Sequence, residues 1–544
     1  MSDHASRRGR IALVLRPFLQ TRKDTLLLAS LILLAGCVSP HGTDRDVAVP
    51  TGYTKVAAPP ADSSSTGSAA GSTNPAAPQG PATNGNGADA SGASMRQDPG
   101  TAPQGPVWGE GSGRSYLVPA VDILAFQFLL NQYDRRYAAD KEDYETDDGT
   151  IRNNLHSSWV IDTDPFATNQ LLHPYTGALY HGFARSAGLT YWESLAYDFV
   201  GSAIWEVAGE TLPPSLNDQI STTFGGSFLG EAMFRMSNAL LGIGGTEPGF
   251  FSRLGAFLIS PSTGVNRFAY GDRFDGIYPS NGPPTFVRLG LGVRHNSLNT
   301  DLGGLSRIQD NEIVADAVID YGIPGKANYE YERPFDFFHF EMTAASAGSA
   351  LPESVMVHGL LTGSRYGTGP ACRGVFGLYG SYDYIAPEVF SVSSTALSLG
   401  TTAQLKFTDA VALQGSCLGG VGWAAAGTIS DASTDNSYHY GVCPQGLVAL
   451  RFIAGSVAML DFTTRAYYLN GVGSGNQGGT ETILRARAAL VVRVYDRHAL
   501  TVQYVSSTRE ANYDATALTD TFQSIGSVSV MWTFLGDTQF GIVD

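Results

Sequence analysis

The stretch ILRARAALVVRVY at residues 483–495 decides the fold, because apolar side chains alternate along it with small or charged ones. One side of the pattern is apolar and consists of Leu484, Ala486, Ala488, Leu490, Val492 and Val494. The other side carries the arginines Arg485, Arg487 and Arg493. A period of two places successive side chains on opposite faces of a β-strand. Apolar residues outside and arginines inside are typical of a membrane-spanning β-barrel, whose lumen is polar.

The rest of the C-terminal part, residues 282–544, continues this pattern between Gly-, Asn- and Ser-rich turns. In FDFFHFEM, the apolar Phe338, Phe340 and Met342 alternate with His339 and Glu341. We expect about twelve strands, at 284–296, 311–322, 335–347, 353–365, 371–385, 393–407, 409–426, 437–454, 456–469, 480–495, 498–512 and 521–535. Single-chain bacterial barrels have even strand numbers, so ten or fourteen stay open. A soluble β-domain is the alternative, against which the inward arginines argue.

The last predicted strand contains GSVSVMWTF at 526–534, which resembles the terminal strand of bacterial outer-membrane proteins. Those strands usually end in an aromatic residue that the barrel assembly machinery recognises. Here the tail 535–544 follows Phe534, which departs from that pattern. Tyrosines near strand ends predict an aromatic girdle at the membrane interfaces: Tyr379, Tyr382, Tyr384, Tyr467 and Tyr468.

The N-terminus predicts export. Residues 1–36 combine a basic region with an apolar run that is too short to span a membrane, as in a signal peptide. The tetrad Leu34-Ala35-Gly36-Cys37 resembles the bacterial lipobox, which implies diacylation of Cys37 and an outer-membrane lipoprotein. The alternative is an ordinary buried cysteine after an uncleaved helix.

A low-complexity segment and the net charge limit the partners. Residues 37–106 are rich in Ala, Ser, Gly and Pro, and they predict a disordered tether or a segment without a role. The chain carries −16, and removing the +4 of residues 1–36 leaves −20. No basic cluster remains, so nucleic acid is excluded as a partner. We expect outer-membrane lipids and the barrel assembly machinery as partners, and a periplasmic protein stays open.

Cysteines are sparse in the barrel half. Cys417 and Cys443 lie in neighbouring predicted strands and could pair, since an exported protein meets an oxidising compartment. Separate thiols, together with Cys372, are the equal alternative.

Residues 107–281 predict an α-helical domain, which makes the whole chain α+β. An amphipathic run at 116–133 comes first, and a helix then ends near Ala187 before Gly188. Further helices are expected at 191–210 and 226–242, the latter with Glu231 and Arg235 as an i,i+4 pair.

These apolar helices carry many titratable groups. Ser202, Glu206 and Glu210 recur every four residues and share one face, with Glu193 roughly opposite. His173 precedes them, and Asn217 and Asp218 follow a Pro-Pro helix stop.

The spacing of these residues resembles the bacterial domain-of-unknown-function 3943 family over about residues 115–280. The resemblance is carried by Asp162, Asp164, Phe166, Asn169, His173, Pro174, Tyr175, Gly177, Tyr180, Arg185, Trp192, Glu193, Ser194, Ser202, Trp205, Glu206, Glu210, Pro214, Ser215, Asn217 and Asp218. It implies a helical domain before a C-terminal barrel, and it implies no established reaction.

Three interpretations of the polar residues stay open. They could form a closed network in which Arg185 neutralises the carboxylates of the stripe, with Glu193 and Asn217 as further members. His173, Glu206, Glu210 and Asp218 could instead bind a divalent metal. A third possibility is ester hydrolysis by Ser202 with His173 and a carboxylate. No HExxH or GxSxG motif is present, which favours a non-enzymatic protein, and no cofactor other than a metal is expected.

The predicted architecture is an outer-membrane barrel whose helical domain plugs the barrel or caps one mouth. Its expected function is envelope maintenance, lipid handling or transport. The alternatives are a hydrolase acting on envelope lipids, a metal-dependent enzyme, and a passive anchor for periplasmic partners.

Overall fold

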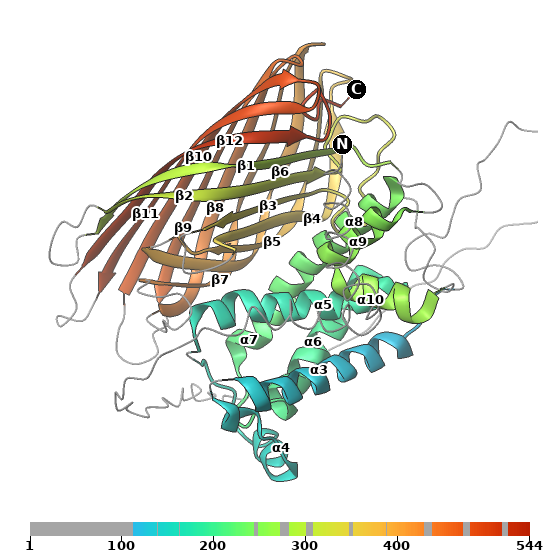
Figure 1. The fold of residues 1–544 in the computed structure, drawn as a ribbon, viewed down its shortest axis with the longest axis vertical. Coiled ribbons are helices and arrows are strands. Elements are labelled where there is room, and N and C mark those ends of the chain that lie inside the picture. The colour runs from blue at the N-terminus through green and yellow to red at the C-terminus, as the bar shows by residue number, and fades with distance from the viewer. Residues whose placement is uncertain are drawn as a thin grey trace, which may run out of the picture.

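The computed structural model describes residues 113–138, 140–162, 164–243, 248–271, 282–300, 308–346, 352–387, 389–428, 438–471, 479–513 and 520–543. A helical part precedes a closed barrel in these ranges (Figure 1). The predicted signal peptide, Cys37 and the predicted tether lie outside the described residues. In the described ranges, no helix combines the length and apolar character needed to cross a membrane.

The helical part contains the predicted helices and shorter ones that the sequence did not predict. Its elements are α3 (Leu117–Tyr137), α4 (Asp148–Asn154), α5 (His173–Ser186), α6 (Tyr191–Ala208), α7 (Leu216–Ile220), α8 (Gly226–Ile243), α9 (Phe250–Ile259) and α10 (Pro261–Tyr270). A capping box between Thr190 and Glu193 begins α6. Gly188, with φ +86°, allows the tight turn between α5 and α6.

Twelve strands close the barrel in the described residues, which confirms the predicted number. They are β1 (Thr285–Thr300), β2 (Ile308–Tyr321), β3 (Phe338–Ala345), β4 (Ser354–Gly367), β5 (Cys372–Ile385), β6 (Phe390–Thr408), β7 (Val411–Thr428), β8 (Tyr438–Ala454), β9 (Ala458–Gly471), β10 (Gly479–Tyr495), β11 (His498–Tyr513) and β12 (Thr521–Leu535). Each strand pairs antiparallel with its sequence neighbours, and β1 pairs with β12. The closed, even-numbered and antiparallel sheet is the architecture of outer-membrane barrels.

Ion pairs cross the lumen between strands that are not neighbours. Arg487 of β10 lies 2.6 Å from Glu341 of β3 and 3.0 Å from Asp316 of β2. Arg465 of β9 lies 2.8 Å from Asp383 of β5. The predicted inward direction of Arg487 is therefore confirmed. Two small cavities, of about 60 and 20 Å³, lie among these side chains.

The C-terminal tail, which follows the terminal aromatic residue Phe534, packs against the end of the barrel. Phe540 is buried in a cluster with apolar residues of β1, β8 and β9. The lumen-facing Gln404 and Gln414 donate hydrogen bonds to the carbonyls of Val543, at 2.7 Å, and of Gly541, at 2.6 Å. The tail thus folds back over the end of the barrel where β12 ends.

The helical part packs on the outside of the barrel wall, so the expectation of a plug or cap is wrong. On β3, His339 points into the lumen toward Asp320, and Phe338 points outward. Phe338 belongs to one buried cluster with Val357 of β4, Tyr382 of β5, and Phe228 and Met233 of α8. Helices thus cover an apolar part of the outer wall. Figure 1 shows α5 and α8 beside the strands, not within the ring.

The predicted aromatic girdle is mostly wrong. Tyr379 and Tyr467 face the lumen, where they bond Thr402 and Asp383. Tyr382 and Tyr384 point outward but are buried under the helical part. Tyr468 alone of the five predicted tyrosines is exposed.

The cysteines of the described barrel are unpaired. Cys417 is exposed and Cys443 is buried. The β7–β8 register pairs Cys417 with Val448 and Gly422 with Cys443, so the two cysteines are not opposite each other. The open question of their pairing is therefore answered in favour of separate thiols.

Candidate functional site

Two π-helical turns shape the site in the helical part. The first, η3 (Thr168–Leu172), leads into α5, and the second, η4 (Ser221–Gly225), leads into α8. Such turns widen a helix by one residue and recur at functional sites. A Cβ on Gly177 of α5 would lie 1.9 Å from the carbonyl oxygen of Thr222, so only glycine lets α5 and η4 approach this closely.

His173, Glu206 and Asp218 converge at these turns, and we call them the His173 site. One ligand atom from each residue lies within 4.8 Å of the other two. His173 Nε2 is 4.0 Å from Asp218 Oδ2, and His173 Nδ1 is 3.2 Å from the Thr222 hydroxyl. A tautomer that donates from Nδ1 to Thr222 leaves the Nε2 lone pair free for a cation.

The electrostatics of the His173 site favour a cation. Burial, and then the neighbouring Glu210, raise the pKa of Glu206 well above its usual range. Burial and Asp162 raise the pKa of Asp218 in the same way. Burial lowers the pKa of His173 to about 4, which keeps the imidazole neutral. In the described part of the chain, no arginine or lysine pairs with these carboxyls.

A second layer of hydrogen bonds orients the site and includes the barrel wall. The Ser215 amide donates to Glu206 Oε2 at 2.8 Å. The Asn217 side chain donates to Asp162 at 2.7 Å and to the hydroxyl of Tyr440, on β8, at 2.9 Å. The predicted network role of Asn217 thus has contacts that support it. These contacts connect the site directly to the outer face of the barrel.

A cavity of about 130 Å³ opens beside the site. Its walls are mainly apolar side chains of α3 and α5, and His173, Ser202, Glu206 and Glu210 line its polar end. The Ser202 hydroxyl is buried, and it has no hydrogen-bond partner among the residues that the structure describes. Glu210 lies just after α6 and accepts a hydrogen bond from Trp205 Nε1 at 2.7 Å, and burial raises its pKa to about 8. The cavity therefore brings together the predicted catalytic and metal-binding candidates except Asp218, which adjoins it through His173.

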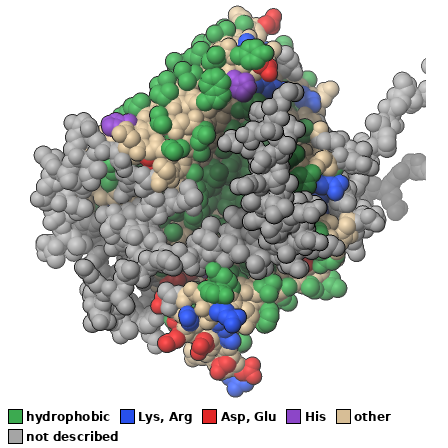
Figure 2. Space-filling model, viewed as in Figure 1, with side chains coloured by type: hydrophobic (Ala, Val, Ile, Leu, Met, Phe, Trp, Pro, Cys, Tyr) green, Lys and Arg blue, Asp and Glu red, His purple; other side chains and the backbone are tan. Residues whose placement is uncertain are grey.

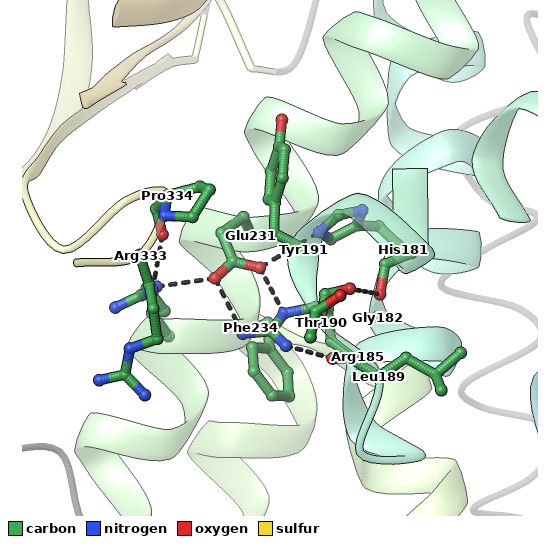
Figure 3. A network of polar contacts seen from close by, with 12 residues as sticks. His181, Gly182, Arg185, Leu189, Thr190, Tyr191, Glu231, Phe234, Arg333 and Pro334 are labelled. Atoms are coloured by element: carbon green, nitrogen blue, oxygen red, sulfur yellow. Dashed lines mark hydrogen bonds and ion pairs between the residues drawn. The ribbon is translucent and has the colours of Figure 1, made fainter. Parts of the chain in front are cut away.

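Arg185 lies elsewhere, so the prediction that it neutralises the carboxylates of α6 is wrong. Its Nε donates to Glu231 of α8 at 2.6 Å. Arg235 Nε donates to the same carboxylate at 2.7 Å, and His181 Nε2 lies 3.1 Å from it. We call these four residues the Glu231 centre. Figure 3 shows Arg185 and His181 beside Glu231.

The Glu231 centre surrounds its carboxylate with two arginines and a histidine. His181 Nδ1 lies 2.7 Å from Asp198 of α6. Arg235 also pairs with Asp336, in the β2–β3 connection, at 3.0 Å. Arg185 and the other cations hold the pKa of Glu231 well below its usual range in spite of burial. This centre fastens α5, α6 and α8 to the barrel.

One predicted residue lies away from the His173 site, and three residues that were not predicted contact it. Glu193 caps α6 and also bonds Arg114, away from the His173 site. Thr222, Asp162 and Tyr440 contact the site, although no role was predicted for them. The family-like DxD spacing that begins at Asp162 was a signal for one of them, whereas only the barrel register brings Tyr440 to the site.

Comparisons with known proteins agree with part of the sequence interpretation. Residues 158–262 match the family described as Domain of unknown function (DUF3943). The match contains the whole His173 site and the Glu231 centre, and it confirms the resemblance found in the sequence. Among curated proteins, none matches this sequence significantly.

Solved outer-membrane proteins are similar to parts of this chain. The outer-membrane channel DcaP of Acinetobacter baumannii has 10% identity and a TM-score of 0.21, with 47% of this chain and 98% of that chain covered. The Pseudomonas putida toluene transporter TodX has 8% identity and a TM-score of 0.18, with 47% and 90% covered. The translocator domain of the Neisseria meningitidis autotransporter NalP has 13% identity and a TM-score of 0.21, with 46% and 90% covered. The assignment of a barrel to this chain rests on its own strand register.

Proposed function

We propose that this protein is an outer-membrane β-barrel that binds a divalent cation at His173, Glu206 and Asp218. The observation that carries the proposal is the convergence of one imidazole nitrogen and two carboxylate oxygens within 4.8 Å. Imidazole and carboxylate are the ligands that Zn²⁺ and related divalent ions use in proteins.

The charge balance supports a cation over a closed network of side chains. A buried carboxylate needs a counter-charge or must be protonated. At the Glu231 centre two arginines supply that charge, whereas at the His173 site the described residues supply only a histidine. A bound divalent ion would allow Glu206 and Asp218 to ionise, and it would compete with the protons that they otherwise hold.

The outer face of the barrel supports location in the outer membrane. Apolar side chains are exposed on β1 and on every strand from β6 to β12, among them Leu291, Leu399, Phe462 and Val530. Lipid anchoring at Cys37 and binding to the assembly machinery or a periplasmic protein remain proposals from the sequence. Ion pairs that cross the lumen would oppose solute passage, so lipid handling or envelope maintenance is the function that we favour.

Metal titration of the detergent-refolded, chelator-treated protein tests the cation site. We expect one Zn²⁺ or Mn²⁺ per chain by calorimetry and by elemental analysis after dialysis. Glu206→Gln and Asp218→Asn should abolish this binding. Glu193→Gln, which changes a carboxylate of α6 outside the site, should bind as the unaltered protein does. Equal binding by all three variants, or none by the unaltered protein, would contradict the proposal.

Membrane fractionation tests the location. The protein should be recovered with outer membranes and should show heat-modifiable mobility on electrophoresis. The Cys37→Ser variant should stay in the membrane, because a closed barrel satisfies its own backbone hydrogen bonds there. Its release into the soluble periplasmic fraction would refute membrane insertion by the strands.

Metal-dependent hydrolysis of an envelope lipid is a second candidate, favoured by the cavity beside the site. A metal lowers the pKa of bound water, and Glu210, whose pKa is raised to about 8, could exchange a proton in the cavity. Fatty-acid release from phospholipid vesicles should then require added metal and should be lost in Glu210→Gln. Release that survives in Glu206→Gln would exclude this site as its source.

A further inference from the structure

The exposed face of α6 is apolar and its buried face is polar, the reverse of a water-soluble amphipathic helix. All of its exposed side chains are apolar: Trp192, Ala196, Phe199, Val200 and Ile204. Its buried positions include Ser194, Asp198, Ser202 and Glu206. The titratable groups therefore face the helical part, and the apolar groups face outward.

Helices α3 and α10 show the same inversion. Between Leu117 and Leu129 of α3, the exposed side chains are Leu117, Val121, Leu124, Ala125, Phe128 and Leu129. The buried face of α3 includes Gln127, Asn131 and Asp134. On α10, Ser262, Thr263 and Asn266 are buried, and Val265, Phe268 and Ala269 are exposed.

The three inverted helices belong to one layer. Gln127 of α3 donates to the backbone carbonyl of Gly201 on α6 at 2.6 Å. Tyr270 of α10 donates to Asp122 of α3 at 3.0 Å. An apolar surface that extends over three connected helices is larger than the scattered exposed residues of a soluble protein.

The helical part adjoins the apolar outer face of the barrel through α8 and η4. On β6, Thr395 lies against Gly225 of η4, and Leu397, the next residue on the same face, is exposed. On β8, Tyr440 is covered by the helical part, and Val442, the next outward residue, is exposed. Hydrophobic side chains are visible on the barrel and on the helical part in one view (Figure 2). The helical part thus interrupts a continuous apolar wall and presents its own apolar face beside it.

We propose that the outward faces of α3, α6 and α10 contact lipid acyl chains, so that the helical domain sits in the bilayer against the outside of the barrel. The inference rests on the membrane insertion proposed above. In this arrangement the three helices lie in the lipid bilayer without crossing it, as interfacial helices do. The last turn of α3 exposes Arg136 and Tyr137, which suit the headgroup level.

The placement also suggests how a ligand would reach the His173 site. Leu129 belongs to the exposed face of α3 and also lines the cavity beside that site. A cavity with its mouth on a lipid-facing helix would admit an amphiphile from the bilayer, with its polar group toward Glu206 and Glu210. The same placement explains why a channel through the lumen is not needed for lipid handling.

Spin-label accessibility in phosphatidylcholine vesicles tests the proposal. The full chain with its four cysteines replaced by Ser or Ala carries one new cysteine at a time, at Phe128, Phe199 or Phe268. Phe128 is 64% exposed, Phe199 53% and Phe268 78%, so each label can reach its surroundings. Val530 on the barrel wall is the lipid-facing control, and Arg152, exposed on α4, is the water-facing control. Variants without heat-modifiable mobility are replaced by labels at Val121, Val200 or Val265.

We expect labels at the three helix positions to be more accessible to oxygen than to a nickel chelate, as at Val530. The opposite ratio is expected at Arg152. Nickel accessibility at the helix positions with a lipid-like ratio at Val530 would overturn the inference and leave the barrel in the membrane. Protection from both reagents would also overturn it, because a second copy or a protein partner would then cover the face. A water-like ratio at Val530 would refute membrane insertion and the inference with it.

Discussion

The Glu231 centre and the His173 site lie in the same helical part, yet they balance charge in opposite ways. At the Glu231 centre, one buried carboxylate meets two guanidinium groups and an imidazole, and the pKa of the carboxyl is lowered. At the His173 site, two buried carboxyls meet one neutral imidazole beside a cavity, and the pKa of each carboxyl is raised. The difference separates a centre whose carboxylate is compensated by cationic side chains from a site whose two carboxyls meet no arginine or lysine among the described residues.

The largest expected effect comes from removing a cation of the Glu231 centre. Arg185→Met leaves Glu231 buried with less counter-charge, and removing one partner of such a pair typically costs about 3–5 kcal/mol. Hydrogen exchange of the α5 and α8 amides should therefore accelerate strongly. Adding Glu231→Gln should restore part of the protection, and adding Glu206→Gln should not. Unchanged exchange in Arg185→Met would show that Arg185 does not stabilise this centre.

The pH dependence of the metal-free protein should reveal the uncompensated site. The folded protein keeps the proton of Glu210 up to about pH 8, whereas an unfolded chain releases it near 4.5. Between these two pH values the folded state binds more protons than the unfolded state does. The stability that Glu210 contributes is therefore fully present below pH 4.5 and falls as the pH rises toward 8. Each such proton contributes a slope of about 1.4 kcal/mol per pH unit.

Urea unfolding followed by tryptophan fluorescence between pH 5 and 8 measures this slope. Glu210→Gln should flatten it, and Glu142→Gln, at an exposed position, should not. Stability that rises over this range in the metal-free protein would contradict the assigned direction. Added metal should oppose the loss, because the ion takes the place of the protons on Glu206 and Asp218 and its charge favours the ionised form of the neighbouring Glu210.

Enlarging Gly177 should disturb the His173 site through its backbone. A Cβ would collide with the Thr222 carbonyl, so Gly177→Ala must push α5 and η4 apart. We expect a loss of about 1–3 kcal/mol, as for other overpacked sites. Metal titration should also show weaker binding, because Thr222 orients His173. Gly242→Ala, where a Cβ meets open space, is the matched control. Equal behaviour of the two variants would refute the close approach.

The smallest expected effect concerns the contact between barrel and site. Tyr440→Phe removes a hydroxyl that accepts hydrogen bonds from Asn217 and Gln170, which costs about 1 kcal/mol. Metal affinity should fall roughly tenfold, as for other partners that orient ligands. Tyr468→Phe, on the exposed outer face, should change neither quantity. An unchanged metal affinity in Tyr440→Phe would show that this contact with the barrel wall does not orient the ligands of the His173 site.

The sequence predicted the barrel closely because strand alternation is a local property. Each of the twelve predicted segments overlaps an observed strand. Arg487 points into the lumen, as the alternation with its apolar neighbours in the sequence predicted. Helices α5, α6 and α8 were also predicted to within a few residues, and Gly188 was the local signal for the boundary between α5 and α6. The candidate residues His173, Glu206 and Asp218 were recognised by chemical type and by resemblance to a family.

Partnership and direction needed the tertiary structure. The local sequence around Arg185 does not predict whether it pairs with Glu231 or with Glu206. The carboxylate of α8 becomes the nearer one only when the helices pack together. An outward tyrosine such as Tyr382 has the same pattern whether it meets lipid or a helix. The sequence alone therefore determined which residues are strands, helices and candidate ligands. Only the tertiary structure decided which charges are balanced and which side of the wall the helices cover, because both depend on contacts between residues far apart in the chain.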